Sequence, residues 1–374
     1  MKFDVSSTAL LSRLQSISKV IASKNSLPIL DSFLFNLEGN KLTITASDSE
    51  TRLVTSADVM NAEGTGLFAI SAKILLDPLK ELPEQPLHFS INDDNMEVSI
   101  HFQNGQYGFI GQRGDTYPQQ KPVGENVTSI QIDAQMLLSG LGRALFATAD
   151  DELRPVMNGI YFDINTDNLT FVASDGHKLA RLRNYSIKAE ERAAFILPKK
   201  PANLLRSVLA REQEEVLIKF DENNAYFTCP NFEMVCRLIE GRYPNYNSVI
   251  PQENPYKVTI DRVSFLNAMK RVAVFSNPAS SLVKLHLLDN QLIVSAQDID
   301  FSTSAEEKIV CQYVDPELKI GFKATYLIEI LANISSEEVV LELADPTRAG
   351  TIVPAENEEN EDLLMLLMPM MLNN

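Results

Sequence analysis

A serine, an aspartate and a histidine lie together at residues 174–177 (SDGH), and these side-chain types form the triad of many hydrolases. A triad is assembled from separate segments of a chain beside an oxyanion hole. Neighbouring residues that follow a strand are more typical of a turn, in which an aspartate accepts hydrogen bonds from backbone N–H groups. We therefore expect Asp175 to cap a turn. Catalysis by Asp175 and His177 stays as the weaker alternative.

The chain offers little other chemistry. Its cysteines, Cys229, Cys236 and Cys311, form no CxxC pair and have no metal-ligand spacing, so we expect reduced thiols. The sequence contains no GxxxxGK loop followed by Ser or Thr, no GxGxxG after a strand and no HExxH helix. We therefore predict a protein without catalytic residues, metal or cofactor, which depends on another protein for any ATP hydrolysis.

The segment that carries these residues occurs three times in altered form. Residues 158–179 (NGIYFDINTDNLTFVASDGHKL) contain two stretches of alternating apolar residues around a polar turn. The same skeleton occupies residues 31–48, at an offset of about 127 residues, and, more weakly, residues 284–298. Each copy predicts a β-hairpin with one buried face. Asp48, Asp175 and Asp298 belong to separate copies, so we do not expect them to form a metal cluster.

Helical patterns flank each hairpin. A short strand and a first helix precede it, with apolar residues at helical spacing over residues 10–21, 137–148 and 265–272. A further strand and a second helix follow at residues 68–83, 195–210 and 320–335, and lead into more strands. The predicted unit is β-α-β-β-β-α-β-β-β, an α+β domain with two helices on one side of mostly antiparallel strands. We predict domains at residues 1–125, 126–253 and 254–374.

The composition suits a soluble protein of about three domains. The chain has 374 residues, of which 45% are hydrophobic, enough for a buried core in each repeat. No apolar run approaches the length of about 20 residues that a membrane helix needs, and the N-terminus has no signal-peptide pattern. We expect a cytoplasmic protein.

Charge is unevenly distributed along the chain. The formal net charge of −17 argues by itself against a nucleic-acid partner, because such binding depends on lysine and arginine. The predicted helices are nevertheless basic, whereas acidic residues gather in turns and strands, as in residues 356–362. This partition favours helices that face a polyanion through weak, non-specific phosphate contacts. The alternative is a repeat scaffold that binds only proteins, with lysines that merely solvate the helices.

Five motifs along the chain resemble those of one family. They are KNSLPILDSF from Lys24, MNGIYFD from Met157, ASDGHKLA from Ala173, EGRYPNY from Glu240 and LMPMML from Leu367. Together they are similar to the bacterial DNA polymerase III beta subunits, the sliding clamps, and the resemblance covers the whole chain. It implies a head-to-tail homodimer that closes a ring of clamp domains around duplex DNA, with helices lining the hole. It also implies a non-catalytic processivity factor for the replicative polymerase.

The resemblance further implies functional residues. A pocket between the second and third domains takes short hydrophobic peptides of polymerases, the clamp loader and repair proteins. By matched motif it contains Met157, Ser174, Gly176, His177, Lys178, Leu179, Pro244, Val249, Tyr326, Leu367, Met368, Pro369 and Met370. The expected DNA-facing residues are Lys24, Arg154, Lys199 and Lys200, and, on helix charge alone, Lys73, Lys80, Arg143, Arg206 and Lys270. The expected dimer contacts are Tyr107, Phe109, Val274 and Phe275.

Three positions depart from the family pattern. Ser248 and Met371 stand where family members often carry arginine, and Ser280 stands where an aromatic residue is common. The preferred partner peptide is therefore expected to differ from that of other members.

Overall fold

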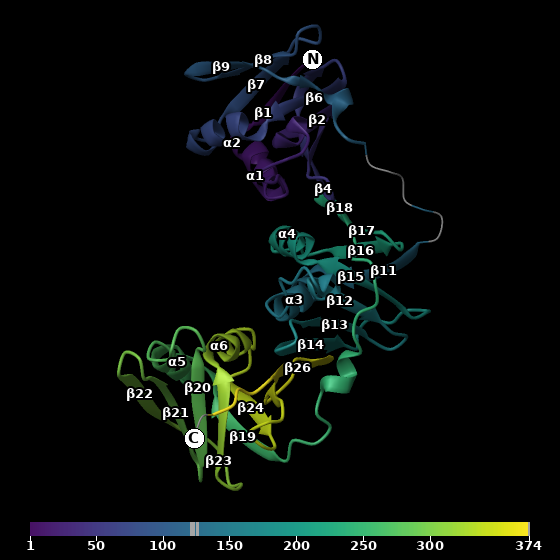
Figure 1. Ribbon diagram of the computed structural model, residues 1–374. Helices are drawn as coiled ribbons and strands as arrows, with labels where there is room; N and C mark the ends of the chain where they lie inside the picture. Colours follow the sequence, from purple (N-terminus) through teal and green to yellow (C-terminus); the bar gives the residue numbers. More distant parts are fainter. Residues whose placement is uncertain (120–123, 125–126, 373–374) are drawn as a thin grey trace. The chain divides into compact units, whose positions relative to one another are not determined.

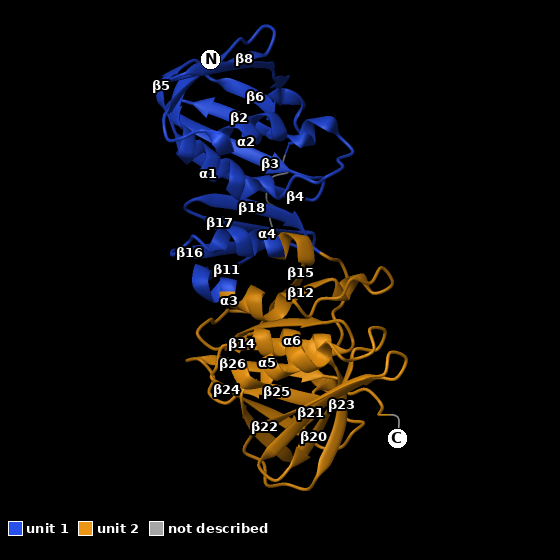
Figure 2. Ribbon diagram, turned by 90° about the vertical axis from the view of Figure 1, so that its left-hand side faces the viewer, with its two compact units in different colours: residues 1–138, 203–238 blue, residues 139–202, 239–374 orange. Residues whose placement is uncertain are grey.

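The structure is a computed structural model that describes residues 1–119, 124 and 127–372 (Figure 1). The chain divides into two compact units, residues 1–138 with 203–238 and residues 139–202 with 239–374 (Figure 2). The helices α3 (Ala134–Leu145) and α4 (Lys199–Leu209) begin in one unit and end in the other. The predicted domain boundary between residues 125 and 126 lies outside the described residues.

The first unit builds two sheets around the helices α1 (Ser7–Ser18) and α2 (Ala72–Glu81), which pack against each other. The five-stranded sheet has the order β5 (Met60–Glu63), β1 (Lys2–Ser6), β7 (Pro86–Ile91), β8 (Glu97–Phe102) and β9 (Gly105–Ile110). The nine-stranded sheet has the order β10 (Gln112–Arg113), β6 (Gly66–Ser71), β2 (Ser32–Glu38), β3 (Lys41–Ser47), β4 (Thr51–Asp58), β18 (Phe232–Arg237), β17 (Asn224–Cys229), β16 (Glu215–Phe220) and β11 (Thr128–Asp133).

The second unit has a similar plan, with the helices α5 (Arg262–Ala273) and α6 (Ala324–Ala332) packed together. Its eight-stranded sheet has the order β15 (Ala193–Pro198), β12 (Gly159–Ile164), β13 (Leu169–Ser174), β14 (Lys178–Asn184), β26 (Glu361–Leu367), β25 (Gly350–Pro354), β24 (Glu338–Leu343) and β19 (Tyr256–Asp261). Its four-stranded sheet has the order β22 (Thr303–Val310), β21 (Gln291–Asp298), β20 (Leu282–Leu288) and β23 (Leu318–Lys323).

The hairpins and helices confirm the predicted α+β repeats. The three hairpins are β2–β3, β12–β13 and β20–β21, each antiparallel. The inward faces of the first two hairpins carry stacked aromatic rings, Phe35 on Phe68 (centroids 5.1 Å apart) and Phe162 on Phe195 (4.4 Å). Burial of such a ring stabilises the fold by about 1.5–3 kcal/mol.

The first helices are shorter than the apolar spacing predicts. α1 begins after Ser6, whose Oγ accepts a hydrogen bond from the Ala9 N–H at 3.0 Å, as an N-cap does. It ends at Ser18 rather than near Ile21, because the chain leaves the helix through a tighter bond from the Val20 N–H to the Ile17 carbonyl (3.2 Å). Lys24 therefore lies beyond the helix, and α3 likewise ends at Leu145 rather than Thr148.

The predicted repeat unit omits one strand that all three repeats contain, and it also omits β5 and β10 of the first repeat. After each hairpin the chain forms an additional strand, which is β4, β14 or β22 in the three repeats, before the strand that leads into the second helix. The sequence pattern of β22 is weak, since this strand reads TSAEEKIV and is largely exposed. Two of the additional strands, β4 and β14, connect the repeats.

The repeats join edge to edge through the additional strands. β4 pairs with β18, with Thr51 opposite Cys236, and we call this pairing the first seam. β14 pairs with β26, with Lys178 opposite Leu367, and this is the second seam. The last strand of one repeat thus continues the sheet of the preceding repeat. Each seam lies within one compact unit, which is why the two units share the middle repeat between them.

Membrane helices, metal sites and reactive cysteines each have requirements with which the described residues can be compared. Within the part of the chain that the structure describes, no helix has both the length and the apolar character needed to cross a membrane, and no group of three or more His, Cys, Asp or Glu could hold a metal ion. The three cysteines are free and buried. Burial raises the pKa of the Cys236 thiol to about 12 and that of Cys229 to about 11, so both remain protonated and unreactive near neutral pH.

Candidate functional site

The segment after β13 forms a turn that Asp175 caps, as predicted. Its Oδ1 accepts hydrogen bonds from the N–H groups of His177 (2.8 Å) and Lys178 (2.9 Å). Gly176 adopts a φ of +91°, which side chains rarely allow. The Ser174 hydroxyl donates to the Lys178 carbonyl at 2.8 Å, so its proton points into the turn rather than toward His177. This geometry does not support the hydrolase alternative.

The same turn occurs in the other two repeats. Asp48 Oδ1 accepts from the N–H groups of Glu50 (2.8 Å) and Thr51 (2.6 Å), and Asp298 Oδ1 accepts from that of Asp300 (2.9 Å). The three aspartates therefore have a structural role that does not depend on their neighbours in the sequence.

The second seam brings the turn of the middle repeat next to the C-terminal segment. The Met368 N–H donates to the His177 carbonyl at 2.8 Å, directly after the paired residues Lys178 and Leu367. The chain then crosses to β23, where the Met370 N–H donates to the Gly321 carbonyl at 2.8 Å. The SDGHKL and LMPMM motifs, far apart in sequence, are thus neighbours in the structure.

The expected pocket residues lie in one region of the second unit at different depths. Pro244, Val249 and Met368 are exposed, with Val249 at 56% and Met368 at 42%. Gly176 and His177 are also exposed, whereas Ser174, Tyr326, Pro369 and Met370 are partly buried. The buried members are Met157, Lys178, Leu179 and Leu367. The first groups form an accessible surface, and the buried members form its floor.

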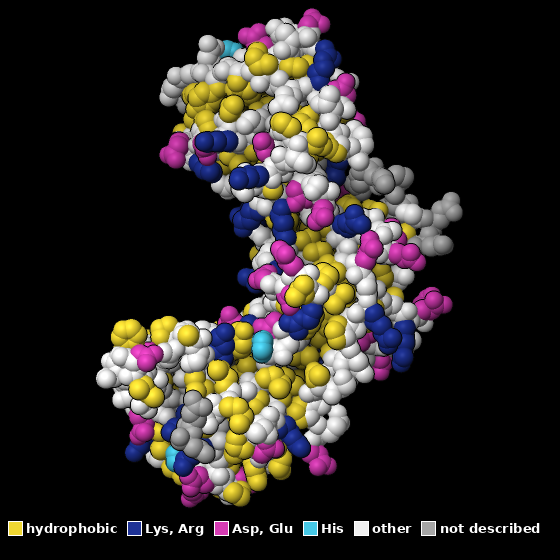
Figure 3. All heavy atoms as spheres, viewed as in Figure 1, with side chains coloured by type: hydrophobic (Ala, Val, Ile, Leu, Met, Phe, Trp, Pro, Cys, Tyr) yellow, Lys and Arg dark blue, Asp and Glu magenta, His cyan; other side chains and the backbone are white. Residues whose placement is uncertain are grey.

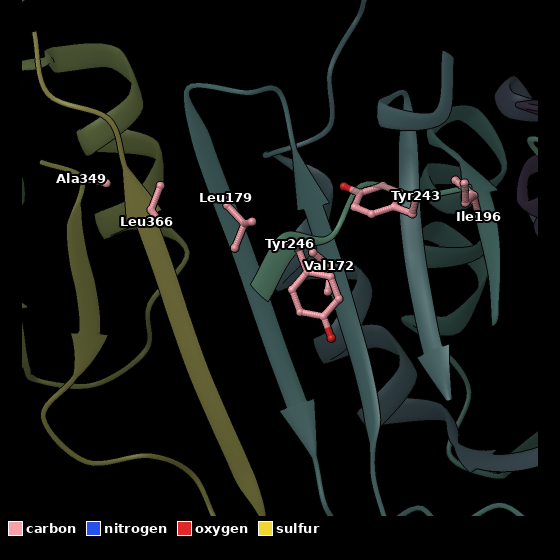
Figure 4. Packing of buried hydrophobic residues seen from close by; sticks show 7 residues of the cluster. All are labelled: Val172, Leu179, Ile196, Tyr243, Tyr246, Ala349 and Leu366. Carbon is pink, nitrogen blue, oxygen red and sulfur yellow. The ribbon is translucent and has the colours of Figure 1, made fainter. Parts of the chain in front are cut away.

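A buried apolar cluster supports this floor (Figure 4). Leu179 on β14 and Leu366 on β26 lie on paired strands and belong to the cluster together with Tyr243 and Tyr246. The Tyr246 hydroxyl donates to Asp163 at 2.7 Å, and burial raises its pKa to about 12. The ring of Tyr243 stacks on a tyrosine of β12, with centroids 4.8 Å apart. The floor is therefore fixed by packing and by hydrogen bonding.

An open groove continues from this surface. It has a volume of about 630 Å³ and includes Val249 and Met368, together with the segment 250–253 and the turn at residues 347–349. Ser248 also lines it, but its hydroxyl donates to the Asn245 carbonyl at 2.6 Å and so bonds within its own 3₁₀ turn, η4 (Tyr246–Val249). An apolar side chain entering here would meet a valine and a methionine, whose flexible thioether side chain adapts readily to different ligands.

The expected DNA-facing residues have varied surroundings. Exposed ones are Lys24, Lys73, Lys80, Arg154, Lys200, Arg206 and Lys270. Lys80 pairs with Asp77 (3.2 Å), Arg154 with Asp151 (2.8 Å) and Lys199 with Asp150 (2.6 Å).

Arg143 differs most from the expectation. Its side chain is only 13% exposed, and it forms an ion pair with Glu358 at 2.8 Å and a hydrogen bond to the Asn333 carbonyl. The guanidinium is thus engaged in holding the middle repeat to the third one within the second unit, and it is not directed to solvent.

Three further basic residues occupy a groove between α1 and α4 in the first unit, with a volume of about 710 Å³. Lys19 donates to the Ser207 hydroxyl (2.9 Å), Arg211 to the Ser12 hydroxyl (3.1 Å) and Arg13 to the Asn231 amide oxygen (3.3 Å). These partners are uncharged, although Glu212 also lines the groove and accepts a hydrogen bond from the Asn231 amide at 3.0 Å. Dark blue side chains gather over these helices in Figure 3. Arg13 and Lys19 are far from Arg211 in the sequence, and only the fold brings the three residues together.

Each sheet ends in strands with one unpaired edge, and β9 and β22 are two of these end strands within the described part of the chain. β9 is the last strand of the five-stranded sheet, and β22 is the first strand of the four-stranded sheet. Tyr107 and Phe109 point to the partly buried face of β9. Val274 and Phe275, directly after α5, are 78% and 40% exposed. Unpaired edges beside exposed apolar side chains mark these strands as possible interfaces.

DNA-clamp proteins are built from repeated α+β domains that join edge to edge through their sheets. The present chain has this architecture. Family models of the N-terminal, central and C-terminal domains of the DNA polymerase III beta subunit match residues 1–119, 131–245 and 247–371. The chain therefore belongs to the DNA polymerase III beta subunit family.

Relatives of similar length support this assignment. A beta sliding clamp of Pseudomonas aeruginosa is 28% identical over 375 residues, covering 100% of both chains. One of Haemophilus influenzae is 28% identical over 380 residues, also covering 100% of both. The structures of the Pseudomonas aeruginosa DNA polymerase III subunit beta (27% identity) and of a Bartonella birtlesii sliding clamp bound to griselimycin (28%) each match with a TM-score of 0.92, covering 100% of both chains. The predicted fold class and family are thereby confirmed.

Proposed function

We propose that this protein is a DNA sliding clamp, which encircles duplex DNA without reading its sequence and makes the replicative polymerase processive in the cytoplasm. The observation that carries the proposal is the edge-to-edge joining of three clamp repeats, which leaves β9 and β22 as unpaired edges in a chain of this family. A closed ring stays on DNA by topology. It therefore requires neither a catalytic site nor tight phosphate binding.

The unpaired edges suggest how two copies close the ring. β9 ends the strands that follow the second helix of its repeat, as β18 and β26 do. β22 follows the hairpin of its repeat, as β4 and β14 do. In the two seams, strands of these two kinds pair with each other. We infer that β9 of one copy pairs with β22 of a second copy, and head-to-tail contacts of this kind close when the rotation is complete.

The seams also suggest the register of the dimer contact. β9 and β18 each begin directly after a two-residue hairpin turn, so Tyr107 corresponds to Met234. Alignment of β22 with β4 through their hairpins makes Ala305 correspond to Leu53, which lies opposite Met234. Tyr107 is therefore expected opposite Ala305, and Phe109 opposite Thr303. The exposed Val274 and Phe275 would then be covered by the partner.

The basic residues of the helices support a DNA-facing role for the helical surfaces. We propose that Lys24, Arg154, Lys199, Lys200, Lys73, Lys80, Arg206 and Lys270 contact phosphates weakly, together with Arg13, Lys19 and Arg211. Exposed ion pairs, as at Lys80, are worth little and exchange readily for phosphate contacts. We leave out Arg143 because of its ion pair with Glu358.

The surface formed by the middle turn and the C-terminal segment is proposed as the docking site for partner peptides. Exposed Val249 and Met368 beside an open groove suit short hydrophobic segments of the polymerase, the clamp loader and repair proteins. Griselimycin, which is bound to a sliding clamp of Bartonella birtlesii, is a suitable probe for this site.

The test is retention on DNA. The protein is loaded by a clamp loader onto nicked circular plasmid, separated from free protein, and the plasmid is then cut once. We expect retention on the circle and release from the linear form. If the protein dissociated equally from the circular and the linear plasmid, the proposal that it encircles DNA would be refuted.

The protein-only scaffold makes a different prediction. With Lys24, Lys199 and Lys200 changed together to glutamate, a clamp should lose primer extension by several-fold at low salt, because phosphate contacts weaken. A scaffold would retain full activity in the same assay. Glutamate at Lys41, Lys188 and Lys284, three lysines outside the proposed surface, is the control for charge.

A further inference from the structure

Lys178 is buried although it carries a charge. The residue is 5% exposed and lies at the start of β14, directly after the turn that carries His177. Its ammonium nitrogen lies 2.5 Å from Glu329 Oε2 on α6 and 3.8 Å from Asp175 Oδ2. A buried lysine loses its hydration and is retained only where anions or aromatic rings compensate.

Aromatic rings complete the surroundings of the ammonium group. It lies 4.4 Å from the ring centroid of Tyr326 and 5.5 Å from that of Phe146. Tyr326 and Glu329 are three residues apart on α6 and so share one face of that helix. The ammonium of Lys178 thus contacts both side chains, one by an ion pair and the other by a cation–π contact, and the Lys323 ammonium also lies 4.5 Å from the Tyr326 ring centroid.

This arrangement sets the distance between two sides of the docking site. His177 and Tyr326 lie with their ring centroids 6.3 Å apart and their planes 25° from parallel. His177 belongs to the turn of the middle repeat, and Tyr326 to α6 of the third repeat. Lys178 lies too deep to meet a peptide, but it connects these two elements.

The first seam shows that the fold itself does not require this ion pair. At the equivalent position, opposite Cys236, stands Thr51, which is 3% exposed. The residue of α4 that corresponds to Glu329 is Leu204, counted from the start of each helix. The first seam therefore closes with the same strand pairing and without a charge at either position. The pair is specific to the seam that carries the docking site.

We propose that Lys178 and Glu329 are positioning residues, which fix the separation of His177 and Tyr326 and so set the shape of the peptide-docking site without contacting the peptide. This inference rests on the proposed function of that site. Lys178 would then support the docking site and not contact the peptide. Glu329 lies outside the five sequence motifs, which therefore do not suggest its role.

The test measures griselimycin binding by calorimetry on the full-length protein, alongside thermal unfolding and light scattering. We expect Lys178→Met and Glu329→Gln each to weaken binding about tenfold, and the double variant to be no weaker than Lys178→Met, because both remove one interaction. Lys178→Arg should restore binding to within a few-fold of the wild type. Thr51→Val at the first seam is the matched control and should leave the affinity unchanged.

The outcomes separate two kinds of failure. Unchanged affinity in both Lys178→Met and Glu329→Gln would overturn the positioning role. The positioning role would also be overturned if Glu329→Gln lost affinity only in proportion to a lower melting temperature, since the loss would then reflect destabilisation of the fold. If Lys178→Met does not fold, Glu329→Gln decides alone, since its side chain is 46% exposed and tolerates change. If the wild type binds no griselimycin, the proposed docking site itself is refuted.

Discussion

One turn serves two purposes at the level of single residues. Asp175 makes the same pair of backbone hydrogen bonds in the middle repeat that Asp48 makes in the first. The neighbours of the aspartate decide the rest, because Lys178 reaches α6, whereas Thr51 is simply buried. The repeats share the backbone geometry of this turn, and the side chains on the turn differ in what they contact.

A matched pair of variants separates these two purposes. Asp48→Ala and Asp175→Ala each leave two backbone N–H groups without their acceptor, one on an exposed residue and one on a buried residue. Each should lower the free energy of unfolding by about 1–3 kcal/mol in urea titrations. Only Asp175→Ala should also weaken griselimycin binding, because its turn carries His177. Equal binding by the two variants would contradict a docking site at the middle turn.

The buried thiols predict a dependence of stability on alkaline pH. The pKa of Cys236 is raised from 9.0 to about 12 by burial, so the unfolded chain loses this proton first as the pH rises. The stabilisation is fully present below pH 9 and is lost as the pH approaches 12, at up to about 1.4 kcal/mol per pH unit. Urea titrations at pH 8 and pH 10 should show a smaller decline for Cys236→Ala than for the wild type. An identical decline would show that this thiol does not contribute.

At the level of elements, the additional strands β4, β14 and β22 decide how the repeats assemble. Each has one edge whose backbone groups are covered only when a strand from the next repeat pairs with it. Two of them find that partner within the chain, in β18 and β26. The third, β22, has none among the described residues, and it is this edge that we propose for the second copy.

Removal of the C-terminal segment should abolish peptide docking without unfolding β26, the strand that precedes it. Leu367 is fully buried and paired with Lys178, so deletion from this residue would damage the second seam. Deletion of residues 368–374 spares β26 and removes the exposed Met368. We expect this truncation to abolish griselimycin and polymerase binding in calorimetry and pull-down assays, with a melting temperature within a few degrees of the wild type. Retained binding would refute the docking role of the segment.

At the level of the whole molecule, an acidic chain is proposed to hold DNA. The net charge is −17, yet basic side chains gather on helices, as in the groove between α1 and α4. A clamp held by topology needs low friction along the duplex, and an acidic exterior reduces adhesion to other nucleic acid. Charge therefore favours sliding, and closure of the ring provides retention.

The proposed dimer can be tested at one strand. Phe109 points to the partly buried face of β9, whereas Ile110 points the other way and is 69% exposed. Phe109→Asp would place a charge at the proposed interface and should convert a species of about twice 41.7 kDa into a monomer in light scattering. Ile110→Asp should leave the dimer intact. A wild-type protein that is monomeric at micromolar concentration would contradict ring closure by two copies.

The sequence by itself determined the repeats, the hairpins, the helices and the family, because alternation and helical spacing are local properties that repetition reinforces. It also marked Asp175 as a turn residue. It did not reveal the seam strands, the burial of Lys178 or the engagement of Arg143 by Glu358. Those depend on which distant strand covers an edge and which carboxylate or ring reaches a charge. Such contacts join residues far apart in the chain, and only the tertiary structure brings them together.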